Sequence, residues 1–445
     1  MSMKKIAKRV MPLSLIVGLR FLGLFIVLSV ISQYVLQMPG GTPLLAGIAL
    51  GGYALTQAFL QVPFGTMSDK FGRRKTIFIG LLIFALGSVI AALADNAYML
   101  ILGRLLQGAG AIGSVVTAMI SDQVREDERA HAMAIMGMVI AMSFAISMIF
   151  GPIIAGVLSV SAIFWMTASM SLLAIVILYT AVPEPPRITH LYSQEEAKIK
   201  HVFKDKDLVK MYITFLFHSS TMAMAFFMIP IIMREQFDMS TLEFWKVYLP
   251  AVIFGILAMA PAAIFGEKYG KGKEVFLVSI VCIALSFILM GFSSSVVVFA
   301  IGAILFFIGF NMFEPLLQSF VSKFAKVHQK GAALGVANTF AYIGIFVGGV
   351  VAGALYGSFG KEGVSIFVIV ATILWFLWIL KMRNPALRAT LFLDFDEYDK
   401  ERLSQLKEIE GLNDYYINTT EQIIVIKYDS AITDEQKLQD IMRRR

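Results

Sequence analysis

Long apolar segments alternate with short polar ones over the first 383 residues. Residues 130–183 contain no Asp, Glu, Lys or Arg, residues 275–322 contain only Glu314, and residues 10–36 contain only Arg20. A helix needs about 20 apolar residues to cross a bilayer core. The pattern predicts an all-α membrane protein with twelve transmembrane helices, at residues 12–36, 44–68, 76–94, 98–121, 130–157, 162–182, 208–233, 247–266, 275–293, 296–322, 331–358 and 363–381.

Composition agrees with a membrane protein. The chain is 58% hydrophobic and 16% charged, whereas a typical soluble domain is about 45–50% apolar and about 25% charged. A water-soluble fold could not cover so much apolar surface, which excludes a soluble enzyme, a disordered chain and a secreted disulfide scaffold. The single cysteine, Cys282, allows no internal disulfide and no multi-cysteine metal site.

The positions of Lys and Arg predict the orientation. The formal net charge is +7, but the loops on one side hold only Arg234, Lys246 and Lys361. The other basic loop residues of the membrane region lie at the N-terminus, in the alternate loops and in the middle segment. Because basic loops stay in the cytoplasm, both termini are expected there, with the chain in the bacterial plasma (inner) membrane. The basic excess therefore reflects topology, and no nucleic-acid binding is expected.

The membrane region contains an internal repeat. Residues 69–75 read Asp-Lys-Phe-Gly-Arg-Arg-Lys and residues 267–273 read Glu-Lys-Tyr-Gly-Lys-Gly-Lys. The same shift places Arg20 opposite His218, each in the first helix of its half. Two parallel six-helix bundles with a site between them form a transporter architecture. The expected domains are a first bundle at 1–183, a cytoplasmic linker at 184–207, a second bundle at 208–383 and a soluble tail at 384–445.

Motifs in the first half resemble those of the major facilitator superfamily. Residues 65–75, Gly-Thr-Met-Ser-Asp-Lys-Phe-Gly-Arg-Arg-Lys, resemble its second-loop signature, and residues 104–111, Arg-Leu-Leu-Gln-Gly-Ala-Gly-Ala, its fourth-helix motif. Residues 61–65 and 245–249 are further similar to the YajR-type drug efflux permeases, which also carry a small cytoplasmic C-terminal domain. Ser29 stands where relatives often have proline, so the sequence offers no proline kink at that position of the first helix.

The resemblance implies roles for these motif residues. In the second-loop motif, an acid four residues before an arginine can pair with it and hold the outward-open state until an acid is protonated. Positive-inside anchoring is the alternative role for this loop. The residues of this conformational latch are Gly65, Asp69, Gly72, Arg73, Arg74 and Asp122. The antiporter motif of the fifth helix, whose first role is helix packing, comprises Gly137, Gly151, Pro152 and Gly156.

Four ionisable residues lie inside predicted spans and away from their ends. A charge facing lipid is costly, so these side chains should face a partner or an aqueous cavity. A proton carrier must be neutral in one state and charged in another, which suits Glu314. Arg20 is also compatible with snorkelling to the membrane surface, and His218 with a hydrogen-bonded packing role. The candidates for proton coupling or the cavity are Glu314, Arg20, His218 and Arg104.

The tail after residue 384 has the composition of a small soluble domain. Its pattern predicts the βαββα order of a ferredoxin-like α+β domain that lacks its last strand. Metal-chaperone domains of this order bind through a Cys-x-x-Cys loop, but residues 396–399 read Asp-Glu-Tyr-Asp, so no metal is expected. The acidic tail is expected to contact the cytoplasmic face or the middle loop. The predicted elements are strands at 390–395, 412–418 and 422–428 and helices at 398–409 and 433–442.

These features predict a secondary active transporter that exports amphipathic or cationic drugs or metabolites in exchange for protons. The proton gradient supplies the energy and no cofactor is expected, because the chain has no Gly-Lys-Ser/Thr nucleotide loop. An enzyme is not expected, because the spans hold isolated ionisable residues only. A metabolite or sugar symporter, and a transporter-like sensor with the tail as output domain, remain alternatives. The expected partners are a small-molecule substrate, protons and the lipid bilayer, and the chain is expected to be a monomer.

Overall fold

The computed structural model describes residues 3–124, 128–183, 202–203, 205–325, 329–384, 388–394, 406, 409–418, 423–430 and 432–442. Within these residues, ten helical segments are long and apolar enough to cross a membrane. The first half contains α1 (Met3–Phe25), α2 (Ile31–Gln37), α3 (Pro43–Phe71), α4 (Arg73–Ala92), α5 (Ala97–Ala109), α6 (Gly113–Gln123), α7 (Arg129–Val157) and α8 (Val160–Thr180). The second half contains α10 (Lys206–Glu235), η2 (Thr241–Glu243), α11 (Trp245–Ala263), η3 (Ile264–Lys268), α12 (Gly272–Phe292), α13 (Val296–Phe324) and α14 (Lys330–Leu380).

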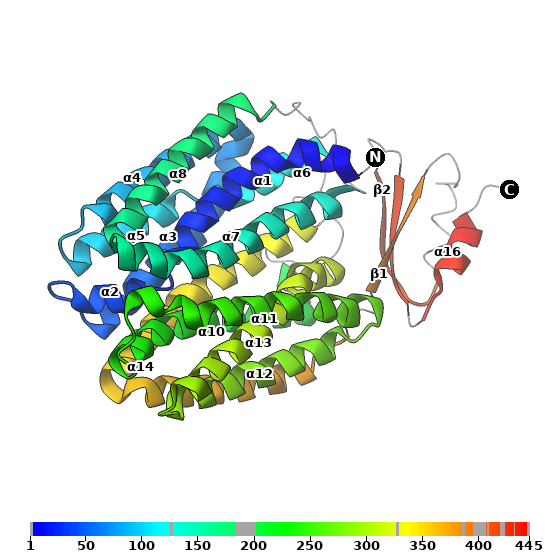
Figure 1. The fold of residues 1–445 in the computed structure, drawn as a ribbon. Coiled ribbons are helices and arrows are strands. Elements are labelled where there is room, and N and C mark those ends of the chain that lie inside the picture. The colour runs from blue at the N-terminus through cyan, green and yellow to red at the C-terminus, as the bar shows by residue number, and fades with distance from the viewer. Residues whose placement is uncertain are drawn as a thin grey trace.

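The two halves lie side by side, with a small sheet beyond one end of the bundle (Figure 1). The N-terminus lies at the same end as the sheet, and we call this the tail end. The opposite end, where α3 begins at Pro43, is called the far end. Helix α10 lies at the centre, because 89% of its most apolar window is buried inside the protein.

Two helix breaks fall inside spans that the sequence predicts as continuous, and two predicted spans join into one helix. Residues 26–30 separate α1 from α2, although Ser29 replaces a proline there. Residues 110–112 separate α5 from α6, because Gly110 packs so closely on α4 that a Cβ would lie 2.2 Å from the oxygen of Gly80. The last two expected spans form the 51-residue α14, which is interrupted at Gly360, where φ is +64°.

The halves pack most closely at the far end. A Cβ built on Gly47 of α3 would lie 2.0 Å from the carbonyl oxygen of Gly349 of α14, and one on Gly353 would lie 2.3 Å from that of Pro43. Small residues allow such backbone contact between membrane helices. At Gly335, on α14 toward the tail end, an added Cβ would meet no heavy atom within 4 Å. Contact between α3 and α14 is thus tightest at the far end.

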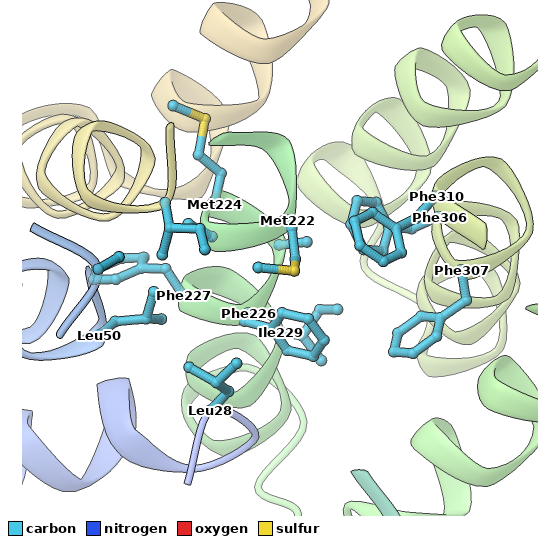
Figure 2. Close-up of a cluster of buried hydrophobic side chains, with 14 of the residues drawn as sticks. Leu28, Leu50, Met222, Met224, Phe226, Phe227, Ile229, Phe306, Phe307 and Phe310 are labelled. Carbon is cyan, nitrogen blue, oxygen red and sulfur yellow. The ribbon is translucent and has the colours of Figure 1, made fainter. Parts of the chain in front are cut away.

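Aromatic side chains fill the centre of the bundle. Figure 2 shows Phe226 of α10 beside Phe307 of α13, and their ring centroids are 5.9 Å apart in an edge-on arrangement. From the first half, Phe144 of α7 contacts Phe226, Phe307 and Phe310 at centroid distances of 5.8–6.2 Å. Edge-on and offset ring pairs add stability beyond the area they bury. This aromatic cluster therefore joins the two halves midway along the bundle.

The tail contains a three-stranded antiparallel sheet. The strands β1 (Arg388–Asp394), β2 (Leu412–Asn418) and β3 (Ile423–Asp429) are arranged in the order β1-β3-β2, and α16 (Glu435–Met442) follows. The alternate residues Ile424, Ile426 and Tyr428 form a core with Leu438 of α16. Of the predicted helix at 398–409, only Leu406 and Ile409 are among the described residues, and residues 396–399 lie outside them.

Candidate functional site

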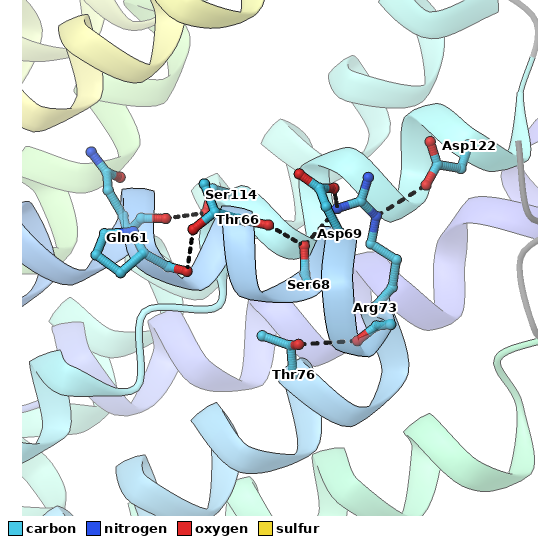
Figure 3. Close-up of polar contacts among 11 residues, drawn as sticks. Gln61, Thr66, Ser68, Asp69, Arg73, Thr76, Ser114 and Asp122 are labelled. Carbon is cyan, nitrogen blue, oxygen red and sulfur yellow. Dashed lines mark hydrogen bonds and ion pairs between the residues drawn. The ribbon is translucent and has the colours of Figure 1, made fainter. Parts of the chain in front are cut away.

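The second-loop motif forms a polar cluster at the tail end of α3. The φ of Gly72 is +97°, a value that favours glycine, and it lets the chain turn from α3 directly into α4. The Arg73 guanidinium then lies 2.5 Å from Asp69 and 3.1 Å from Asp122 of α6 (Figure 3). Arg73 also donates to the Ser68 hydroxyl. The cluster therefore connects α3, α4 and α6 within the first half.

Arg74 occupies a different place from Arg73. Its guanidinium donates to the carbonyl oxygen of Val182 and lies 5.3 Å from the ring centroid of Tyr179 on α8. The two neighbouring arginines thus attach α4 to α6 on one side and to the end of α8 on the other. Gly65, one turn before Ser68, lies near α6, because a Cβ added to it would be 3.7 Å from the hydroxyl of Ser114.

The second half contains a simpler version of this cluster. Glu267, which the repeat places opposite Asp69, forms an ion pair with Lys323 near the end of α13. Glu267 also accepts a hydrogen bond from Ser319 at 2.5 Å. In the first half, Arg73 bridges two acids on different helices. In the second half, the described contact is a single ion pair that joins Glu267 directly to α13.

The antiporter-motif residues of α7 lie in different packing environments. A Cβ on Gly151 would lie 2.3 Å from the carbonyl oxygen of Ile26, so this glycine allows α7 to approach the end of α1, and Pro152 follows inside the helix. Gly156 packs against Leu242 of the second half, where an added Cβ would be 2.9 Å from the backbone. At Gly137 a Cβ would meet no heavy atom within 4 Å.

The fourth-helix motif builds a buried polar network. Arg104 is fully buried and donates to the carbonyl oxygen of Ala49 at 3.2 Å and to the side chain of Gln107 at 2.7 Å. Gln107 in turn donates to Ser88 at 2.8 Å. The guanidinium carbon of Arg104 lies 4.6 Å from the ring centroid of Tyr53. The network holds α3, α4 and α5 together without a carboxylate.

Arg20 lies beside this network. Its side chain is 1% exposed and donates to Gln57 of α3 at 2.9 Å, so it does not reach the membrane surface. Tyr342 of α14 interacts electrostatically with Arg20 and reaches Gln57 across the boundary between the halves. One turn along α3, Gln61 donates to Thr339 of α14. Polar side chains of α3 therefore face α14 directly.

Glu314 and His218 lie on α13 and α10. His218 contacts the carbonyl oxygen of Phe310 through Nε2 at 3.1 Å and stacks on its ring. Glu314 is exposed, one turn from Phe310 and two turns from Phe307, which face α7 of the first half. Residues at these spacings share a helix face, so Glu314 lies on the inward-turned face of α13. No described residue forms a hydrogen bond or ion pair with it.

Sequence reasoning missed the polar face of α3. Tyr53, Gln57 and Gln61 recur at four-residue spacing inside an apolar span, which places them on one face. Polar residues at this spacing in a membrane helix indicate a lined interface or cavity. The missed partner, Tyr342, carries no comparable signal, because only the approach of α14 brings it to Gln57.

Two similar helical halves that enclose charged and polar side chains where they meet define a multi-pass membrane transporter. The sequence pattern of the Major Facilitator Superfamily matches residues 13–266 and 245–394. The chain belongs to this superfamily, and it is a transporter rather than an enzyme.

Individual relatives agree with this assignment. The chain is 33% identical over 440 residues to the inner membrane transport protein YajR of Escherichia coli K12, and the match covers 97% of this chain and 96% of YajR. It is 26% identical over 358 residues to the quinolone resistance protein NorA of Staphylococcus aureus, covering 78% and 90%. The crystal structure of a mutant of the nucleoside transporter NupG has a TM-score of 0.67 at 15% identity, covers 83% of this chain and 98% of NupG, and shares the fold.

Proposed function

We propose that this protein exports amphipathic or cationic compounds from the cytoplasm in exchange for protons. The observation that carries the proposal is Glu314, an exposed acid on the inward-turned face of α13 without a described partner. Neighbouring aromatic rings offer faces that attract cations. An acid in this position can bind either a proton or a cationic substrate, which is the requirement for exchange. The similarity to a protein named for quinolone resistance supports the export of drugs.

The topology within this proposal has twelve crossings. Together α1 and α2 form the first crossing, α5 and α6 form the fourth, and α14 contributes two that are separated at Gly360. The tail end carries the N-terminus and the basic motif loop, so it faces the cytoplasm in this proposal. The arrangement is a single chain in the bacterial inner membrane, and transport needs no cofactor.

Transport in this proposal proceeds by rocking of the two halves. Close packing of Gly47 against Gly349 supports the assignment of this structure, within the proposal, to the state that is closed toward the periplasm. In the opposite state the far end separates and the tail end closes. The cluster of Asp69, Arg73 and Asp122 then holds the tail end of the first half as the latch, and protonation of an acid releases it.

The tail acts in this proposal as a ferredoxin-like regulatory module. The sheet order β1-β3-β2, with β3 antiparallel to both neighbours, supports that assignment, because it is the order expected when two crossing helices cover one face. The module contains no metal site in this proposal. Its place at the tail end brings it to the cytoplasmic face.

The proposal is tested by transport in proteoliposomes. An acid-inside pH gradient is imposed, ethidium is the cationic probe, and internal pH and ethidium uptake are followed together. We expect ethidium to enter as protons leave, and Glu314→Gln to abolish this exchange. Glu274→Gln, at an exposed acid at the start of α12, is the matched control and should transport like the wild type.

Each other outcome contradicts a defined part of the proposal. Full exchange by Glu314→Gln removes this acid from the mechanism. Probe movement in the same direction as the protons indicates a symporter. Absence of flux for ethidium and for a panel of cationic and neutral drugs favours a sensor that uses the transporter fold.

A further inference from the structure

Two arginines are buried in the first half without an acid to balance them. Arg20 and Arg104 are 1% and 0% exposed. The sequence contains no Asp or Glu at 1–68, 70–94 or 96–121, which together cover the helices around them. A buried charge normally requires an opposite charge or a full set of hydrogen bonds. Neither side chain has an opposite charge among the described residues.

Their hydrogen bonds are also incomplete. In the described part of the chain, Nε and Nη1 of Arg20, Nη2 of Arg104 and the hydroxyl of Tyr53 are buried without a hydrogen-bond partner. On α3, Tyr53 stands one turn from Ala49, which accepts a hydrogen bond from Arg104, and one turn from Gln57, which accepts one from Arg20. The unpaired donors therefore belong to side chains along one face of α3, between Ala49 and Gln57. Such donors would be satisfied by the oxygens of an anion.

The surroundings indicate an anion with an apolar body. The guanidinium carbon of Arg20 lies 5.3 Å from the ring centroid of Phe84 and 5.9 Å from that of Phe21, and that of Arg104 lies 4.6 Å from Tyr53. Aromatic rings beside the charged donors can pack against an apolar or aromatic group attached to a carboxylate. A strongly hydrated inorganic ion gains nothing from these rings.

The place of this cluster allows entry of a ligand. Gln57, which binds Arg20, also reaches Tyr342 of α14, so the cluster lies at the boundary between the halves. Separation of α3 from α14 would uncover it. We infer that Arg20 and Arg104 form a binding site for the carboxylate of an amphipathic organic acid, and that this site is closed in the present structure.

This inference goes beyond the proposed function, because it concerns an anionic ligand and a different half from Glu314. It also does not depend on proton coupling. A transporter without proton exchange would still bind the carboxylate, and a proton-coupled exporter of cations need not bind it. Binding is therefore measured directly, in the full chain in lipid nanodiscs.

The probe is benzoate, which replaces chloride at constant ionic strength while the thermal unfolding temperature is followed. We expect the unfolding temperature to rise saturably with benzoate concentration. It should not rise with benzamide, the neutral analogue of similar shape. Arg20→Gln and Arg104→Gln should each raise the dissociation constant for benzoate at least tenfold. Arg234→Gln, at an exposed arginine near the end of α10, is the control and should keep wild-type binding.

Two milder variants keep the test informative if a buried arginine is needed for folding. Arg20→Lys retains the charge and should bind with intermediate affinity. Tyr53→Phe removes only the unpaired hydroxyl and should weaken binding a few-fold. Equal stabilisation by benzamide, no change on replacing chloride, or wild-type affinity in all four site variants would overturn the inference.

Discussion

Arg73 shows how one side chain joins two acids on different helices. Its Nε and Nη1 atoms contact Asp122 and Asp69, so loss of either acid leaves the arginine with one ion pair. Asp69 is more exposed than Asp122, with side-chain exposures of 62% and 23%. Exposed ion pairs contribute little to stability. The two acids should therefore differ in their effect on folding.

We predict that Asp69→Asn lowers the rate of ethidium exchange at least fivefold and leaves the expression level unchanged. In the proposed mechanism this pair helps to hold the tail end closed, and because Asp69 is exposed the pair contributes little to folding. Asp122→Asn should lower both transport and the unfolding temperature, since its pair is largely buried. Asp95→Asn, at an exposed acid before α5, is the control. Unchanged exchange by Asp69→Asn would favour simple anchoring of the loop.

At the scale of elements, the contact between α3 and α14 depends on glycine. A Cβ on Gly349 would lie 2.5 Å from the oxygen of Gly47, a distance that side chains do not adopt without movement of the backbone. Gly335 lies on the same helix, but an added Cβ there meets nothing within 4 Å. One helix thus provides both a sensitive position and a control.

We predict that Gly349→Ala destabilises the closed far end. Overpacking costs about 1–3 kcal/mol, which would lower the population of this state relative to the opposite one by a factor of about 5 to 150. Spin labels on Tyr98→Cys and Phe359→Cys, both exposed at the far end, report the distance in a Cys282→Ser background. The fraction of molecules with a longer distance between the two spin labels should increase in Gly349→Ala. It should stay at the wild-type level in Gly335→Ala. Identical distributions would show that the contact tolerates a methyl group.

The central strand of the tail sheet contributes hydrogen bonds that attach the tail to the bundle. Lys427 is 4% exposed and donates to the carbonyl oxygens of Ser322, at 2.8 Å, and Ala325, at the end of α13. The last carbonyls of a helix have no partner within the helix, and a lysine can satisfy them. This described contact therefore uses a basic residue of an otherwise acidic tail.

We predict that Lys427→Met loosens the tail. Hydrogen bonds from a charged group contribute about 1.5–3 kcal/mol, and methionine keeps the apolar stem without the donor. Trypsin should then release the tail at least tenfold faster, as followed by gel electrophoresis. Lys437→Met, at an exposed lysine of α16, removes a cleavage site of similar kind and serves as the control. Equal release rates would show that apolar contacts hold the sheet.

Hydropathy predicts where elements lie better than how they bend. The apolar runs placed α3, α4, α7, α8 and α10–α13 within a few residues, because each run must match the bilayer. The breaks at residues 26–30 and 110–112 were not predicted, since the second of them reflects the approach of Gly110 to Gly80. Likewise the pairing of Arg20 with Gln57 depends on the neighbouring helix and is not visible in one sequence.

At the scale of the whole molecule, polar contacts at the far end join residues of the first half to residues of the second half. The Ser32 hydroxyl donates to the carbonyl oxygen of Phe227 at 2.9 Å, and Gln33 lies 3.5 Å from the hydroxyl of Thr241. These pairs join α2 to α10 and to η2. Exchange by rocking requires them to break in every cycle.

We predict that a cross-link across this boundary stops transport reversibly. Gln33→Cys with Thr241→Cys, in a Cys282→Ser background, is joined by a short bifunctional methanethiosulfonate, and ethidium exchange should fall in proportion to the cross-linked fraction. Reduction should restore it, because the halves can then separate again. The control pair is Phe78→Cys with Tyr179→Cys, whose rings are 5.9 Å apart within the first half. That pair should transport normally when cross-linked, because rocking moves each half as a unit. Exchange that survives the Gln33–Thr241 cross-link would require a pathway in which the far end stays closed.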